Sequence, residues 1–362
     1  MLASGAVTPP AEVQTSTTRQ LDDSIEKQPL LKIPLPSRFG AGAVQLNLGD
    51  LRDQAAAAEV CRQETAASYE EIAQNVAGGN PADLAGVSDV VNRMRECIRG
   101  DVAIGSLLMD FNSTDRDFIL THGLNVGFLV TATGKWMGLE DKLIQQVAMA
   151  ALLQDIGMLR VPETIRFANR PLTDDDRAIV EHHPIHSLDM LENSSFFGQT
   201  GLVVAYQVHE QCNRSGYPRK RQRATIHPMA RLTAVADVYA AVTCTRPYRQ
   251  SRIPYQGVTT LLEEAKAGRL DPDYVRIFLD CFGLFPVGSY VGLSDGRTAQ
   301  VIHANGPKHT RPVIVPIEFD GRESDEQIDL VAQSDLSIVR AISKGEATGG
   351  EDDDPVTRDE AA

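Results

Sequence analysis

The chain has 362 residues, of which 42% are hydrophobic, and it carries a net charge of −14. A chain of this length and apolar content can bury a sizeable core. The negative charge excludes a general binder of nucleic-acid polymers or of anionic membranes, because both need a cationic face. No apolar run reaches the roughly 18 to 20 residues of a membrane-spanning helix. The sequence therefore predicts a cytoplasmic protein without a membrane segment.

Both ends of the chain lack the periodicity of folded elements. Residues 1–40 are rich in Ala, Pro, Ser, Thr and Gln, and we predict a disordered tail there. Residues 343–362 include four consecutive acids beside Gly and Pro, which indicates a second, acidic disordered tail.

Residues 41–112 are predicted to be a helical N-terminal region. Apolar residues recur on one helical face over 51–76 and again over 84–98, in steps of three and four. Such a stripe is typical of a packing face within the fold or of a homodimer seam. The stripe comprises Tyr69, Ile72, Val76, Leu84, Val87, Val91, Met94 and Ile98.

Helical signals dominate residues 113–285. Thr173 is followed by three aspartates, a capping box that predicts a helix running to about Leu191. Asp271 before Pro272 predicts another helix start.

Residues 286–342 are predicted to form a small β appendage. The segments 290–293 and 298–303 flank Asp295-Gly296 and indicate a hairpin, and 313–319 indicates a further strand. The predicted fold class is mainly α, a helical bundle with a small C-terminal β appendage and two disordered tails.

Five cysteines are widely spaced and include no C-x-x-C pair, a pattern typical of reduced intracellular thiols. The histidines are more informative, because six of the eight lie between residues 122 and 227. Asp155 and Asp237 accompany them in apolar helical segments, where an unpaired carboxylate is costly to bury. Taken singly, each of these residues is more often structural. Together they are typical of the ligands with which a bundle holds divalent iron or manganese.

The order and spacing of four motifs resemble the HD-GYP domain family. The resemblance covers about Asp115 to Pro316 and implies an HD-type helical bundle in which two or three metals drive the cleavage of cyclic di-GMP. The motifs are Gln154-Asp-Ile-Gly157, His183-Pro184, His209-Glu210 with Ser215-Gly-Tyr-Pro218, and Ala234-Val-Ala-Asp237 leading to Arg246-Pro-Tyr-Arg249.

The resemblance implies five metal ligands: His122, Asp155, His183, His209 and Asp237. One half-site would use His122, Asp155 and Asp237, and the other would use Asp155, His183 and His209. Asp155 would bridge the metals, so it is also the residue to which the resemblance gives a catalytic role.

The implied ligand set is incomplete at two positions. Gln154 stands where the family has the histidine of its HD pair, and Val208 replaces the first histidine of a His-His-Glu run. An amide oxygen is a poor substitute for imidazole, and a valine offers no ligand atom. Met158 also replaces a lysine expected to face phosphate. We therefore predict clearly less than one tightly held iron or manganese per chain after purification.

The residues that the resemblance implies for nucleotide binding are retained: Tyr217, Arg246 and Arg249. A phenol and two cations can bind a phosphate and a guanine. The competing interpretation is that Tyr217 and Pro218 hold a turn, that the two arginines pair with local acids, and that the basic stretch 219–223 is merely solvated.

The sequence thus favours a degenerate HD-GYP protein with lost or strongly reduced hydrolysis. It would act as a module that binds cyclic di-GMP, or that contacts a signalling protein or a second copy of itself. The alternative is a metal-dependent cyclic di-GMP phosphodiesterase with an altered metal site, which the five retained ligand positions favour.

Overall fold

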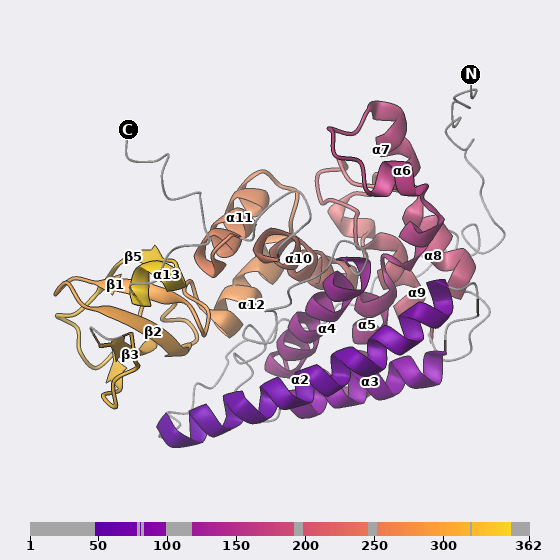
Figure 1. The fold of residues 1–362 in the computed structure, drawn as a ribbon. Coiled ribbons are helices and arrows are strands. Elements are labelled where there is room, and N and C mark those ends of the chain that lie inside the picture. The colour runs from indigo at the N-terminus through magenta and orange to yellow at the C-terminus, as the bar shows by residue number, and fades with distance from the viewer. Residues whose placement is uncertain are drawn as a thin grey trace.

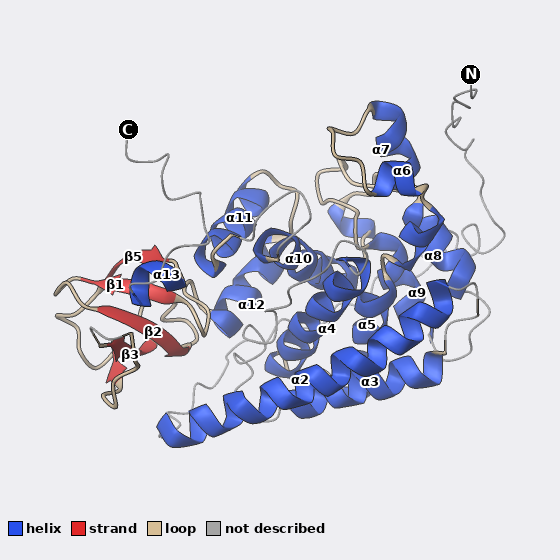
Figure 2. Cartoon of the chain, viewed as in Figure 1, coloured by secondary structure: helices blue, strands red, loops and turns tan. Residues whose placement is uncertain are grey.

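The computed structural model describes residues 48–98 apart from 78, 79, 81 and 82, and then 118–191, 198–244, 252–318 and 321–348. The predicted tail 1–40 lies outside the described residues, as does most of the acidic tail. The described helices gather into one body, and an antiparallel sheet lies at its C-terminal end (Figure 1, Figure 2). This arrangement confirms the predicted mainly α fold with a small C-terminal β appendage.

Two long helices, α2 (Leu48–Ala77) and α3 (Leu84–Cys97), run side by side along the helical core (Figure 1). The N-cap Asp83 starts α3 by accepting a hydrogen bond from the backbone of Gly86. The described members of the predicted apolar stripe are buried in the core: Tyr69, Ile72, Val87, Val91, Met94 and Ile98. The stripe is therefore a packing face of this chain, and these side chains are not available to a homodimer seam.

The same two helices correct the prediction that all cysteines are free thiols. Cys61 on α2 and Cys97 on α3 form a disulfide, with Cα atoms 5.6 Å apart. Their 36-residue separation says nothing about pairing until the register of the two helices is known. Among the described residues, Cys212, Cys244 and Cys281 take part in no disulfide.

The helical core places α4 and α5 at its centre, in contact with each other and with α10. Its middle is filled by fully buried aromatic and aliphatic side chains, among them Phe128, Leu129, Tyr239 and Phe278. None of the described helices is both long and apolar enough to cross a membrane. The helices are α4 (Phe118–Trp136), α5 (Asp141–Leu153), α9 (Gly198–Gln207), α10 (Pro228–Thr243), α11 (Pro254–Lys266) and α12 (Pro272–Phe282). Three shorter turns are η2 (Ile156–Arg160), α6 (Glu163–Arg166) and η3 (Arg223–Thr225).

Both predicted helix starts are confirmed. Asp271 caps α12 by accepting a hydrogen bond from the backbone of Asp273, and Thr173 and Asp176 form the predicted capping box. The helix that begins after Thr173 does not continue to Leu191, however. It divides into α7 (Asp174–Val180) and α8 (His183–Leu191), because Pro184 has no N–H to continue the backbone ladder.

The β appendage is a five-stranded antiparallel sheet in the order β4-β3-β2-β1-β5. The predicted hairpin is confirmed: Val291 pairs with Ala299, and Gly296 in the turn has a φ of 90°. The strands are β1 (Tyr290–Leu293), β2 (Thr298–His303), β3 (Val313–Ile317), β4 (Ile328–Asp329) and β5 (Ile338–Ile342). Their side chains enclose a small apolar core of their own.

The first residues of the predicted acidic tail are folded. Residues 344–348 form a short helix, α13 (Lys344–Thr348), beside β1. Ala347 is buried there, and Glu346 pairs with Arg340 of β5 at 2.5 Å. The composition of this segment suggested a solvated tail, but these two contacts attach it to the sheet.

Candidate metal centre

Five side chains singled out by the resemblance lie together in the helical core. They are His122 on α4, Asp155 just after α5, His183 at the start of α8, His209 just after α9 and Asp237 on α10. Their nitrogen and oxygen atoms form two overlapping groups, Asp155-His183-His209 and His122-Asp155-Asp237, each within 4.8 Å. These are the two half-sites of the sequence mapping. Their role as metal ligands stays a prediction.

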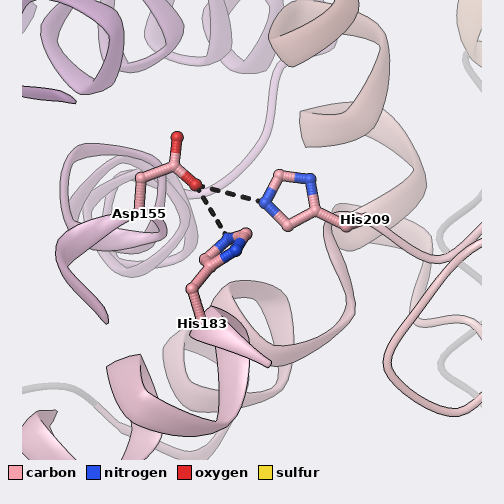
Figure 3. Close-up of side chains that lie close together, drawn as sticks. All are labelled: Asp155, His183 and His209. Atoms are coloured by element: carbon pink, nitrogen blue, oxygen red, sulfur yellow. Dashed lines mark hydrogen bonds and ion pairs between the residues drawn. The ribbon is translucent and has the colours of Figure 1, made fainter. Parts of the chain in front are cut away.

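In the first group, two imidazoles face one carboxylate oxygen (Figure 3). Oδ1 of Asp155 lies 3.1 Å from Nε2 of His183 and 3.2 Å from Nε2 of His209. Burial alone would raise the pKa of Asp155, but hydrogen bonds and charge from both histidines hold that pKa well below its ordinary value. Asp155 is thus an ionised carboxylate in a nearly closed site.

The break between α7 and α8 fixes the orientation of His183. Pro184 cannot donate to the carbonyl of Val180, and Nδ1 of His183 bonds to that carbonyl instead, at 2.7 Å. A proton on Nδ1 leaves Nε2 to face Asp155, where a proton or a metal can lie between them. The helix-breaking proline therefore presents His183 in the tautomer that a metal requires.

The second group is held by hydrogen bonds to Asp237. Its Oδ1 lies 2.8 Å from Nε2 of His122 and accepts an N–H from the amide of Gln154 at 2.7 Å. Nε2 of His122 is also 3.7 Å from Oδ2 of Asp155. Burial would raise the pKa of Asp237, but the hydrogen bond and charge of His122 lower that pKa. Gln154 thus contributes a donor where the resemblance implies a ligand.

Comparison with known proteins agrees with this arrangement. The family model described as HD domain matches residues 109–274. A cyclic di-GMP phosphodiesterase of Pseudomonas aeruginosa is 31% identical over 229 residues, which cover 63% of this chain and 54% of that protein. The helical core is an HD-GYP domain.

Other relatives carry related names. A 3′3′-cGAMP-specific phosphodiesterase of Vibrio cholerae is 30% identical over 171 residues, covering 47% of this chain and 39% of that protein. A solved HDG"Y"P protein from Bdellovibrio bacteriovorus has a TM-score of 0.50 at 21% identity, covering 62% of this chain and 70% of that one. At this identity the likeness to the solved protein concerns the fold alone. The chain spans about half, or less, of the curated relatives' length.

A glycine and a serine bring the elements of the HD-GYP domain into reach of each other. A Cβ on Gly157 would lie 2.1 Å from the carbonyl oxygen of His183, so only glycine lets η2 pack against the start of α8. The hydroxyl of Ser187 accepts a hydrogen bond from the backbone of Gly157 and donates one to the carbonyl of Gln154. Ser187 thereby positions Asp155 relative to His183, a role that its sequence context does not indicate.

The loop after His209 is held by a buried acid. Oε1 and Oε2 of Glu210 each accept a backbone N–H, from Arg219 and Arg221, both at 2.7 Å. Gly216 lies so close to the backbone of His209 that a Cβ there would be 2.4 Å from its carbonyl oxygen. The loop is therefore folded back onto His209.

Replacing Glu210 with alanine should destabilise the HD-GYP domain. The substitution leaves two backbone N–H groups without their acceptor, and we expect a loss of about 2 to 4 kcal/mol in the free energy of unfolding. Urea denaturation measures it. The matched control is Glu263→Ala on an exposed face of α11, which should change stability by less than about 0.5 kcal/mol. Equal losses in both variants would contradict the role given to Glu210.

The tyrosine of the GYP motif lies over the histidines. The Tyr217 ring stacks on His209, with ring centroids 5.0 Å apart, and meets His183 edge-on at 5.9 Å. Burial, followed by the charges of Asp155 and Asp237, raises the pKa of Tyr217 well above its usual value. The phenol is thus a neutral hydrogen-bond donor at physiological pH, beside the two histidines.

The remaining predicted nucleotide-facing residues, Arg246 and Arg249, lie outside the described residues. The basic stretch before them is largely occupied in structural contacts. Arg219 donates to the Tyr206 hydroxyl at 2.8 Å, and Arg223 pairs with Asp271 at 2.8 Å and with Asp273. The interpretation of this stretch as merely solvated is therefore wrong for Arg219 and Arg223.

Two of the three departures from the family's pattern, Val208 and Met158, are packed among apolar side chains. Val208 is buried, with 1% of its surface exposed, and supplies no donor to the site. Met158 packs against an apolar cluster that includes Val161, Ile165 and Ile179. Neither side chain can bind a metal or a phosphate, so these two positions now serve the stability of the fold.

Proposed function

We propose that this HD-GYP protein binds a cyclic dinucleotide beside Asp155 and has lost, or nearly lost, its hydrolysis. The observation that carries the proposal is the Gln154 amide, which donates its N–H to Asp237 where the resemblance implies a metal-binding imidazole. The buried Val208 supports it from the other half-site. The names of the relatives support a cyclic dinucleotide as the ligand.

Hydrolysis of a phosphodiester needs more than a binding site. Bound metals would activate a water and offset the charge that develops on the phosphate. In this chain, Asp155 would be shared by both half-sites, and each half retains three ligand atoms. The Met158 side chain offers no cation to the phosphate. The proposed nucleotide-binding residues are therefore Tyr217, Arg246 and Arg249.

Calorimetry with cyclic di-GMP, and with 3′3′-cGAMP as the second ligand, tests the binding. We expect heat of binding that weakens with added salt, because the contacts are to phosphates. Arg246→Ala should weaken the binding by about 1.5 to 3 kcal/mol if its guanidinium contacts a phosphate. Arg276→Ala, whose side chain on α12 is 75% exposed, is the matched control and should leave the affinity unchanged.

Absence of heat with either dinucleotide would contradict nucleotide binding. It would favour the other role of a degenerate HD-GYP domain, the contact with a signalling protein or a second copy of the chain.

A second candidate function is a metal-dependent cyclic di-GMP phosphodiesterase with an altered metal site. The observation in its favour is the grouping of all five retained ligand residues within the two half-sites. An active phosphodiesterase would form linear product from cyclic di-GMP, and Asp155→Ala would abolish that product. A protein that has lost hydrolysis would form none.

A further inference from the structure

The two half-sites of the candidate metal centre differ in their ligand residues and in the hydrogen bonds made to their carboxylates. In the Asp155-His183-His209 group, only imidazole nitrogens approach Oδ1 of Asp155 among the described residues. In the His122-Asp155-Asp237 group, an amide N–H also points at the carboxylate, from Gln154 to Oδ1 of Asp237. The two groups therefore present different surroundings to a cation.

The orientation of the Gln154 amide follows from the charge of its partner. An ionised carboxylate only accepts hydrogen bonds, so the amide must turn its NH2 group, and not its oxygen, toward Asp237. The side chain is completely buried, and its Oε1 has no hydrogen-bond partner among the described residues. Gln154 thus directs its donor into the half-site and its acceptor away from Asp237.

An amide N–H does not lose its proton in water at accessible pH. Unlike an imidazole, the Gln154 amide nitrogen therefore cannot become a metal ligand and remains a hydrogen-bond donor to Asp237. A cation bound to the same Oδ1 would have to share it with that donor and with His122, whose Nε2 lies 2.8 Å from it. The amide hydrogen takes one of the two lone-pair directions of Oδ1 and brings partial positive charge to it, so this oxygen attracts a cation less strongly. The His122 half-site is therefore disfavoured for a metal.

The other half-site fits a metal better. His183 is fixed by the carbonyl of Val180 so that Nε2 faces Asp155, and His209 presents its own Nε2 to the same oxygen. Two imidazoles and one carboxylate are a ligand set suited to Fe(II) or Mn(II), with positions left for water. The buried carboxylate supplies negative charge without a competing amide (Figure 3).

We propose that the Gln154 amide N–H stands where a second metal would bind Asp237. The chain therefore binds a single divalent cation, at Asp155, His183 and His209. The inference rests on the proposed metal-binding role of these residues, but not on nucleotide binding or turnover. The site would be mononuclear, and the His122-Asp237 pair would serve to hold α4 against α10. A variant that restores the imidazole should open the second half-site.

Titration of the full chain with Mn(II) alone tests the proposal, by equilibrium dialysis with elemental analysis and by electron paramagnetic resonance. With Mn(II) in excess, we expect the wild type to saturate at one Mn(II), held too weakly to stay bound through purification, without the exchange coupling of a manganese pair. Gln154→His should saturate at two and show that coupling. His183→Ala should weaken the single site by on the order of a hundredfold, while His122→Ala should leave its affinity within about threefold.

Several results would overturn the proposal. Two Mn(II) in the wild type would mean that the Gln154 amide turns and ligates through its oxygen. One Mn(II) that is lost in His122→Ala but kept in His183→Ala would place the metal in the other half-site. No saturable Mn(II) in the wild type would contradict the single site itself. Because the wild type and the two alanine variants decide the matter, the proposal can fail even if Gln154→His does not fold.

Discussion

Asp155→Ala is expected to abolish all metal binding by this HD-GYP protein. The carboxylate belongs to both groups of candidate ligands, so its removal leaves each group with two side chains. It also removes the negative charge that faces both His183 and His209. Without this carboxylate, one group would hold a doubly charged cation on two neutral imidazoles alone, and the other on one imidazole and the Asp237 carboxylate. Two ligands in either group weaken binding beyond detection at micromolar metal.

The matched control is Asp295→Ala, in the exposed turn of the β hairpin, which should bind Mn(II) as the wild type does. Circular dichroism should show that both variants keep the helical fold. Retention of a full equivalent of Mn(II) by folded Asp155→Ala would contradict the assignment of these residues as ligands.

The second large effect is expected from rebuilding the family's site. The triple variant Gln154→His, Val208→His and Met158→Lys supplies two imidazoles and the phosphate cation, and it should bind two metals. Its cleavage of cyclic di-GMP should exceed the wild-type level at least about a hundredfold, as expected for groups that act on the transition state. The measurement is chromatography of the linear product with manganese or iron present.

The single variants should behave differently from the triple variant. Gln154→His alone should gain a metal without gaining turnover, because the groups of one catalytic centre act as a unit and their effects do not add. Val208 is buried, so a thermal melt must show that the added imidazole is accommodated. Turnover in any single variant equal to that of the triple variant would contradict this account.

Local signals in the sequence predicted the local structure well. The capping box at Thr173, the cap at Asp271 and the turn at Asp295-Gly296 each depend on neighbouring residues, and each is confirmed. The Thr173 helix was predicted too long, because Pro184 lies near the start of a new helix and was not recognised as a break. The two-residue β4 is too short for a periodic pattern.

The grouping of the candidate ligands was predicted from the resemblance and not from spacing. No pattern in the sequence alone states that residues 122 and 237, on α4 and α10, contact each other. The direction of the Gln154 amide and the bridge made by Ser187 depend on three-dimensional packing. The Cys61–Cys97 pair likewise depends on the register of two helices and could not be read from the sequence.

The most direct test of the central claim is the fate of cyclic di-GMP in the presence of the wild-type protein. The protein is incubated with the dinucleotide under anaerobic Fe(II) or under Mn(II), and the products are resolved by chromatography beside a protein-free control. This account predicts that the dinucleotide is recovered intact while calorimetry of the same sample shows that it is bound. Formation of linear product by the wild type, and its loss in Asp155→Ala, would contradict the account and identify an active phosphodiesterase.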